Sequence, residues 1–86
     1  MGCQSGMHEL GVLYQALKTV SRIAEKNQIQ RVKQITLEVG TESTFVPAFF
    51  EKLFPVASDQ FPLIKGARLE IQMAQGKALL IKDIGY

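Results

Sequence analysis

Alternation of apolar and polar residues at every second position restricts the fold of this chain more than any other feature. The pattern appears in VKQITLEV (32–39) and again in ARLEIQM (67–73). The residues predicted to share the buried side are Ile35, Leu37, Val39, Ala67, Leu69, Ile71 and Met73. Strands of this kind bury one face and leave the other in solvent. The sheet that they form therefore needs a covering layer on one side only.

Two segments have the helical spacing that such a layer requires. Residues 7–27 carry an apolar stripe, and Asn27 is a suitable residue to end the helix. The stripe consists of Leu10, Leu13, Leu17, Val20 and Ala24, with Tyr14 and Ile23 beside it. A second apolar face covers residues 46–57, where TEST (41–44) supplies helix-start residues and Pro47 fits the first turn. Pro55 removes a helical hydrogen bond, so we expect a break or kink near Phe54.

The order of these segments predicts the topology. Residues 67–84 contain two strands around a short turn, AQG (74–76), and predict a β-hairpin in which Leu79 and Ile81 point inward and Leu80 points outward. The strands before and after the second helix can pair in parallel through a right-handed crossover. We therefore predict an α+β fold of order αβαββ: a two-layer sandwich with two helices on one face of a mixed three-stranded sheet. Residues 1–6 are predicted to be a flexible N-terminal tail, and residues 7–86 a single domain.

Composition excludes several classes of function. The 86 residues carry a net charge of +2 with basic and acidic residues interleaved, so nucleic-acid binding has little support. No run of 18 apolar residues exists to span a membrane. A single cysteine, Cys3, excludes an internal disulfide and a four-cysteine zinc site. Without a signal-peptide pattern, the cytoplasm is the expected location.

The only histidine, His8, lies beside Glu9 where the first helix is expected to begin. Position 12 is valine, so the second histidine of a zincin motif is missing. From residue type alone, His8 is either a metal ligand or a solvated polar residue at a helix start. The start of a helix disfavours the imidazolium form, which suits a ligand. No nucleophile–base pair is present that would indicate an enzyme.

An ordered set of short motifs resembles the nickel-insertion accessory proteins of hydrogenase and urease maturation, the HypA family. The set runs over residues 7–84: MHEL at the first helix, Val-Gly after the first strand, Val-Pro at the second helix, then GARLEI and GKALLIKDI. The resemblance implies a two-helix, three-stranded nickel domain that is not an enzyme. It also implies that Met7, His8 and Glu9 bind Ni(II), and that the ion is delivered to the hydrogenase large subunit together with a maturation GTPase.

The chain departs from the family pattern in two places. The zinc domain that the family inserts between its last two strands is absent, since MAQGKAL closes that connection and no cysteine remains there; no zinc is expected. The Gly-Glu that follows the first strand in the family is Gly40-Thr41 here. These losses keep open a second function: a protein-interaction or regulatory module of the same fold. Its open sheet edges could pair with a partner strand or a second copy in a homodimer.

Met7 is preceded by six residues in this chain, and this affects the predicted chemistry. Ni(II) favours square-planar nitrogen donors. A free terminal amine, with an unperturbed pKa of about 8, is a good donor, whereas an amide nitrogen must first lose a much less acidic proton. We expect a strong site if the mature chain starts at Met7 and a weak one if it starts at Met1.

Other residues have plainer interpretations. Glu9 could contribute its backbone nitrogen to the metal site, or a carboxylate that orients His8. Alternatively, it could be a helix-start carboxylate that faces the positive end of its own helix. Cys3 could form a metal-binding pair with His8, but two ligands on a tail make a poor site, and Cys3 is expected to be an adventitious thiol. Acidic residues Glu38, Glu42 and Glu51 are expected to point outward. The five phenylalanines, Phe45, Phe49, Phe50, Phe54 and Phe61, are expected to pack in the core, with Phe45 partly exposed.

Overall fold

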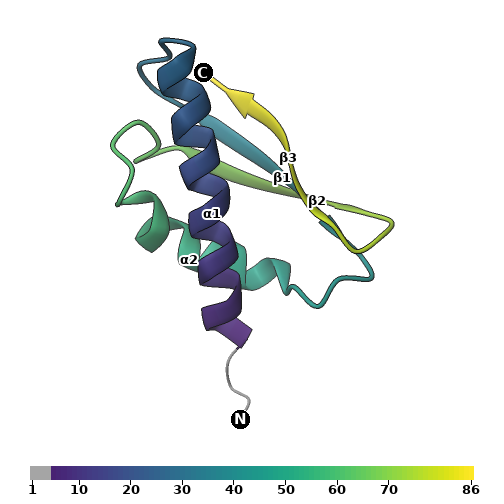
Figure 1. Cartoon of the computed structure of the whole chain (residues 1–86). Helices are drawn as coiled ribbons and strands as arrows, with labels where there is room; N and C mark the ends of the chain where they lie inside the picture. The colour runs from purple at the N-terminus through teal and green to yellow at the C-terminus, as the bar shows by residue number, and fades with distance from the viewer. Residues whose placement is uncertain (1–4) are drawn as a thin grey trace.

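The computed structural model of the chain describes residues 5–86, and their side chains from Glu9 onward. Its elements follow the predicted order αβαββ. They are α1 (Ser5–Lys26), β1 (Gln34–Gly40), α2 (Pro47–Ser58), β2 (Arg68–Ala74) and β3 (Leu79–Gly85). Both helices lie on one face of the sheet, which confirms the predicted α+β sandwich (Figure 1). Residues 1–4 of the predicted tail lie outside the described residues, whereas Ser5 and Gly6 are the first residues of α1.

The apolar stripe of α1 packs as its spacing predicts. Leu13, Leu17 and Val20 are completely buried, and Tyr14 beside them is half-buried. The helix ends at Lys26, one residue before the expected end. Asn27 stabilises that end, because its side-chain amide donates a hydrogen bond to the carbonyl oxygen of Ile23 at 2.8 Å.

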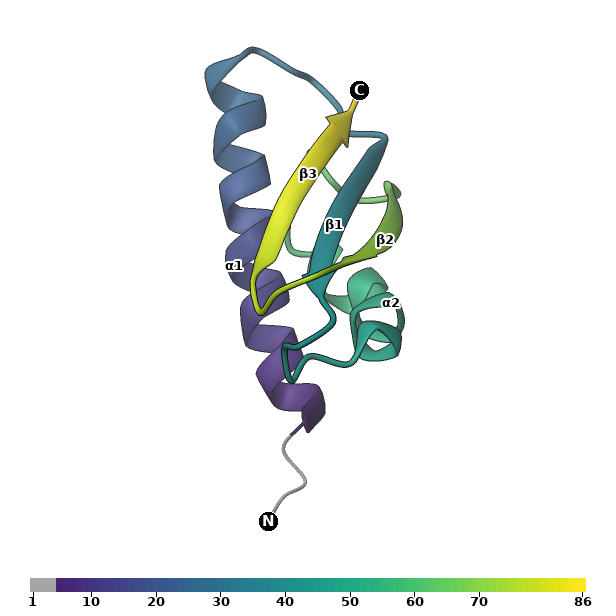
Figure 2. The same ribbon diagram turned by 90° about the vertical axis from the view of Figure 1, so that its right-hand side faces the viewer.

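The predicted hairpin at residues 67–84 is wrong. The strand order in the sheet is β2-β1-β3, so β2 and β3 lie on opposite sides of β1 (Figure 2). The pair β1–β2 is parallel, as predicted, and β1–β3 is antiparallel. Alternation specifies which face of a strand is buried, but it does not specify which strands are neighbours.

The short connection between β2 and β3 passes the end of β1 instead of folding back. The Gly40 N–H donates to the carbonyl oxygen of Ala78 at 2.9 Å, and the Thr41 N–H donates to that of Ala74 at 2.7 Å. The last residue of β1 and the one after it are thus bonded to both ends of the connection. This arrangement makes β1 the central strand and leaves one edge each of β2 and β3 open.

Helix α2 differs from the prediction at both ends. Pro47 is in the first turn, as expected, but the N-cap residue is Val46, which follows TEST, and it makes no side-chain capping hydrogen bond. Pro55 does not break the helix, which continues to Ser58. Pro55 is exposed, and the buried residues Phe50, Phe54 and Ala57 hold the other face of the helix in the core. Tertiary packing therefore outweighs the local cost of the proline.

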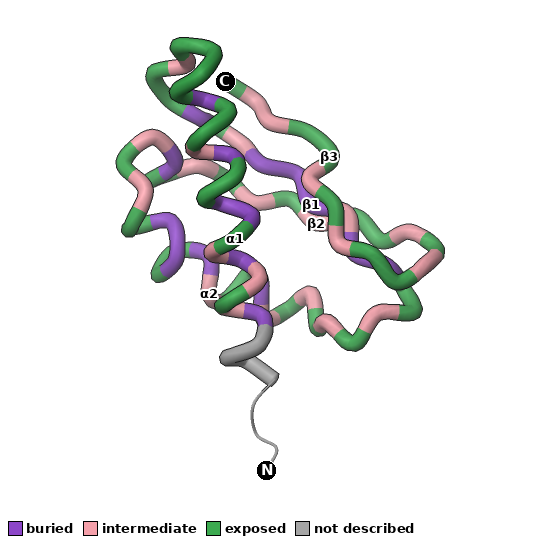
Figure 3. Tube along the Cα trace, viewed as in Figure 1, coloured by how far each residue is buried: buried purple, intermediate pink, exposed green. Residues whose placement is uncertain are grey.

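The core lies between the helices and the sheet (Figure 3). Ile35, Leu37 and Val39 of β1 are fully buried. On β2, Met73 was predicted to point inward but is 51% exposed, because it lies near the end of an edge strand. Leu80 points outward as predicted, with 54% of its surface exposed. Phe50 and Phe54 are buried, and the other three phenylalanines are half-buried, Phe45 among them. Within residues 5–86, no helix is long and apolar enough to cross a membrane.

Candidate functional site

The segment predicted to bind metal forms the first turns of α1. Met7 and His8 belong to the helical backbone, while their side chains lie outside the described part of the chain. These turns extend past the end of the sheet, beside the loop that leads from β1 into α2 (Figure 2). Glu9 is the first residue whose side chain is described, and it links the two regions.

The Glu9 side chain is directed into the protein. The residue is only 1% exposed, and its Oε2 accepts a hydrogen bond of 2.8 Å from the backbone N–H of Val46. Val46 is the N-cap residue of α2, whose own first turn contains no acidic residue. Glu9 thus supplies from α1 the capping group that the local sequence of α2 lacks.

This geometry corrects one interpretation of Glu9. The first turn of α1 contains no acidic residue, so Glu9 does not face the N-terminus of its own helix. Its carboxylate instead faces the N-terminus of α2, where unpaired N–H groups and the helix dipole favour negative charge. Glu9 is a carboxylate at the positive end of a helix, as that interpretation holds, but the helix is α2 and not α1.

The second carboxylate oxygen of Glu9 is in an unusual position. Oε1 is buried and has no hydrogen-bond partner among the residues whose side chains are described. Burying a carboxylate is costly unless its charge is compensated. The Val46 N–H and the α2 dipole provide part of that compensation.

The loop that contains Val46 is held by local hydrogen bonds. Ser43 Oγ donates to the carbonyl oxygen of Gly40 at 2.7 Å, and it accepts a 3.4 Å hydrogen bond from the N–H of Phe45. The Phe45 ring packs against that of Phe50, with 5.7 Å between their centroids. The partner of Glu9 is therefore fixed relative to the sheet.

Sequence reasoning missed Val46, because its contribution is a backbone N–H that lies 37 residues away from Glu9. One signal was available. The residue directly before Pro47 is valine, which cannot cap a helix through its side chain. That absence leaves the first N–H groups of α2 to water or to a side chain from elsewhere in the fold.

The remaining acidic residues do not form a metal site. Among the residues that the structure describes, no three His, Cys, Asp or Glu side chains gather closely enough to hold an ion. Glu38 forms an ion pair with Lys82 at 3.7 Å, and Glu42 and Glu51 are exposed. Cys3 lies outside the described residues. Glu38, Glu42 and Glu51 were predicted to point outward, and their exposure is consistent with that prediction.

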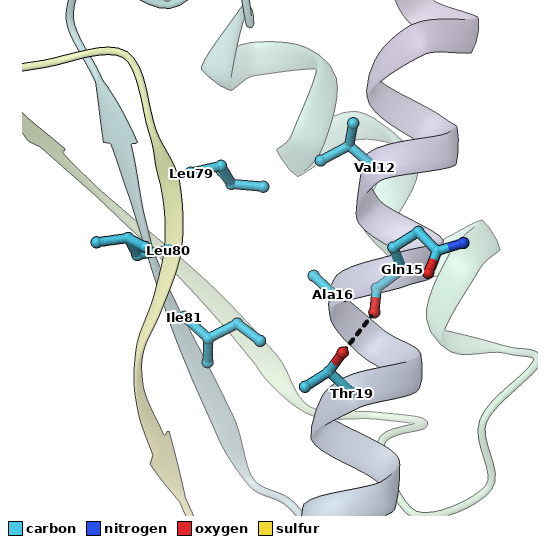
Figure 4. Close-up of a pocket in the computed structure, with 7 residues that line it drawn as sticks. All are labelled: Val12, Gln15, Ala16, Thr19, Leu79, Leu80 and Ile81. Carbon is cyan, nitrogen blue, oxygen red and sulfur yellow. Dashed lines mark hydrogen bonds between the residues drawn. The ribbon is translucent and has the colours of Figure 1, made fainter.

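A shallow apolar groove separates α1 from the open edge of β3 (Figure 4). Val12 and Ala16 face Leu79 and Ile81 across it, while Leu80 points away from the helix. Glu9 does not line this groove. The groove and the buried carboxylate are thus separate features of the molecule.

Comparison with known proteins identifies relatives of this chain. Residues 7–79 match the family model described as hydrogenase/urease nickel incorporation, metallochaperone, HypA. A hydrogenase maturation factor HypA from Trichodesmium erythraeum is 37% identical over 65 residues, which cover 76% of this chain and 54% of the relative. The protein of the same name from Methanopyrus kandleri is 31% identical over 70 residues, covering 81% and 49%. The chain therefore spans about half the length of the curated relatives that it matches.

A solved structure shares the fold. The solution structure of the Ni metallochaperone HypA from Helicobacter pylori superposes with a TM-score of 0.72 at 17% identity. The match covers 87% of this chain and 70% of the other. At this identity the likeness concerns the fold alone, and it agrees with the two-layer arrangement described above.

Proposed function

Because the chain belongs to the HypA family of hydrogenase and urease nickel-incorporation metallochaperones, we propose that it binds Ni(II) at Met7-His8-Glu9 and delivers it. The family consists of metallochaperones, not enzymes. The ion is cargo, destined for a [NiFe]-hydrogenase or a urease. The receiving partners are those that the family resemblance implies, a maturation GTPase and the hydrogenase large subunit. The main support is that the family match begins at Met7, the first residue of the segment.

The proposed donors are nitrogens. His8 supplies its imidazole, Met7 its terminal amine where the chain starts there, and Glu9 its backbone nitrogen. Such a set suits Ni(II), which favours square-planar nitrogen coordination. The Glu9 carboxylate is already bonded to α2, which favours the backbone nitrogen of this residue over its side chain.

Helix geometry explains why the residues before Met7 matter. The first four N–H groups of an α-helix have no partner within the helix. In α1, which begins at Ser5, the N–H of Glu9 is the fifth and pairs with the carbonyl four residues back. In a chain that begins at Met7, the His8 and Glu9 nitrogens are among the free groups. The shorter form therefore offers more available donors.

Replacing His8 tests the proposal. In the form that begins at Met7, His8→Ala should weaken Ni(II) binding by roughly 100-fold or more, beyond the 10- to 100-fold typical of groups that only support a ligand. The thermal unfolding midpoint should not change, and Lys18→Ala, on the exposed side of α1, serves as the control. Unchanged nickel affinity would contradict the proposal, and a large loss of stability would identify His8 as structural.

A protein-interaction or regulatory module without metal delivery is the second candidate. The open edges of β2 and β3 favour it, since unpaired strand edges can accept a strand from a partner or a second copy. The same titration separates the two functions. Failure of both the full chain and the Met7 form to bind nickel would favour the interaction module.

A further inference from the structure

We propose that the Glu9 side chain is a positioning residue of the nickel site and not a ligand: it caps α2 and thereby orients the first turns of α1. The inference rests on the function proposed above. It assigns to one carboxylate a role that links two helices. The observations that carry it are its burial, its hydrogen bond to Val46, and a second oxygen that has no partner among the side chains that the structure describes.

The carboxylate cannot easily leave α2 to bind an ion. Withdrawing Oε2 would leave the Val46 N–H without its acceptor at a helix start that has no other side-chain cap. Val46 is 40% exposed, so water can reach its N–H, but the partly buried hydrogen bond to the carboxylate would still be lost, and hydrogen bonds to charged groups are stronger than neutral ones. Oε1 remains free of a described partner, but it is buried. A cargo ion that must pass to another protein needs ligands that can be reached and exchanged.

The same contact can control the geometry of the site. Glu9 directly follows His8, so fixing the Glu9 side chain restricts the backbone that carries the imidazole and the proposed nitrogen donors. The fixed point is Val46, in a loop held by Ser43 and by the packing of Phe45 on Phe50. The metal-binding turns are thus oriented by contacts that begin at the end of β1.

Three substitutions of Glu9 distinguish the effect of its side-chain length from the effect of its charge. Glu9→Gln keeps the length and an acceptor oxygen but removes the charge. Glu9→Asp keeps the charge but is one methylene too short for the 2.8 Å hydrogen bond to Val46. Glu9→Ala removes both. A positioning role predicts that Gln resembles the wild type and that Asp resembles Ala, whereas a carboxylate ligand predicts that Asp binds nickel better than Gln.

The experiment is a Ni(II) titration of the four proteins, as full chains and as forms beginning at Met7. Removing residues 1–6 leaves intact the buried core, which begins at Leu13. We expect Glu9→Gln to stay within about threefold of the wild type, and Glu9→Asp and Glu9→Ala to bind roughly 10- to 100-fold more weakly, the range for supporting groups. Nickel should also shift the Val46 amide resonance in the wild type and in Glu9→Gln, a response that a purely structural cap would not give.

The outcomes distinguish this inference from the proposed function. Nickel binding by the wild type, combined with loss of binding in Glu9→Gln at an unchanged melting temperature, would overturn the positioning role alone. A Val46 resonance that does not respond to nickel would also overturn it. No nickel binding by either wild-type form would overturn the proposed function and the positioning role together.

Discussion

Gly40 shows how a single residue allows the chain to pass from one edge of the sheet to the other. A Cβ at this position would lie 2.6 Å from the carbonyl carbon and closer still to the carbonyl oxygen of Gly76, and 2.9 Å from the backbone nitrogen of Lys77. All three atoms belong to the backbone of the β2–β3 connection. The absence of a side chain at Gly40 therefore permits the connection to cross the end of β1.

We predict opposite effects for two glycine substitutions. Gly40→Ala should destabilise the fold by about 1–3 kcal/mol, because the backbone of the connection must shift. Gly11→Ala, at an exposed position of α1 where a Cβ meets nothing within 4 Å, should stabilise it by about 0.5–1 kcal/mol. Denaturant unfolding measures both, and a neutral Gly40→Ala would contradict the account of the crossing.

At the residue scale, the sequence predicts some features and misses others. The buried positions of α1 and β1 follow from the spacing of their apolar residues. Leu17 and Leu37 lie on the apolar face that this spacing predicts, and both are fully buried. The role of Glu9 does not follow, because its partner is a backbone group distant in sequence. Its assignment as a metal-site residue came from the motif, which carries no information about where the carboxylate points.

At the scale of elements, the central position of β1 organises the domain. It pairs with β2 in parallel and with β3 in antiparallel fashion, and five of its seven residues are buried. The sequence predicts the three strands but not their order, because a four-residue connection, residues 75–78, is short enough to suggest a hairpin. The close approach at Gly40 is visible only once the strands are in place.

The burial of one face of the sheet predicts a matched pair of substitutions. Leu37→Ala, at a fully buried position of β1, should cost about 2–5 kcal/mol. Leu80→Ala, on the outer face of edge strand β3, should change stability by less than about 0.5 kcal/mol. Chemical denaturation gives both values. Similar costs at the two positions would show that Leu80 does not lie on an exposed face of β3.

Amide hydrogen exchange tests the order of the strands in the sheet. Amides of β1 are bonded on both sides of the strand, so they should exchange most slowly in the sheet. Amides on the outer edges of β2 and β3 should exchange rapidly. Slow exchange on the outer edge of β2, together with rapid exchange on one edge of β1, would instead indicate that β2 pairs with β3 in the hairpin predicted from the sequence.

At the scale of the whole molecule, one continuous core supports the fold. Thirteen buried apolar residues from both helices, β1 and the adjoining loops form a single cluster. The Cα radius of gyration, 12.6 Å, is near the roughly 12 Å expected for a compact domain of this length. The described residues therefore share one apolar core that can support the fold.

We accordingly predict that a chelator leaves the stability of the metal-free protein unchanged. The chain should unfold in one cooperative transition whose thermal midpoint is the same with and without EDTA, because no described part of the fold is built around an ion. Far-ultraviolet circular dichroism measures the midpoint. A substantial decrease with EDTA would reveal a structural metal and contradict this account.

The central claim is that Ni(II) binds at Met7-His8-Glu9 through donors that include the Met7 amine. Its most direct test is a calorimetric Ni(II) titration of two preparations, one beginning at Met1 and one at Met7, with melting curves to show that both are folded. We predict tight one-to-one binding by the Met7 form and much weaker binding by the Met1 form. Equal affinity in the two forms would contradict the role of the amine, and no specific binding in either would contradict the claim as a whole.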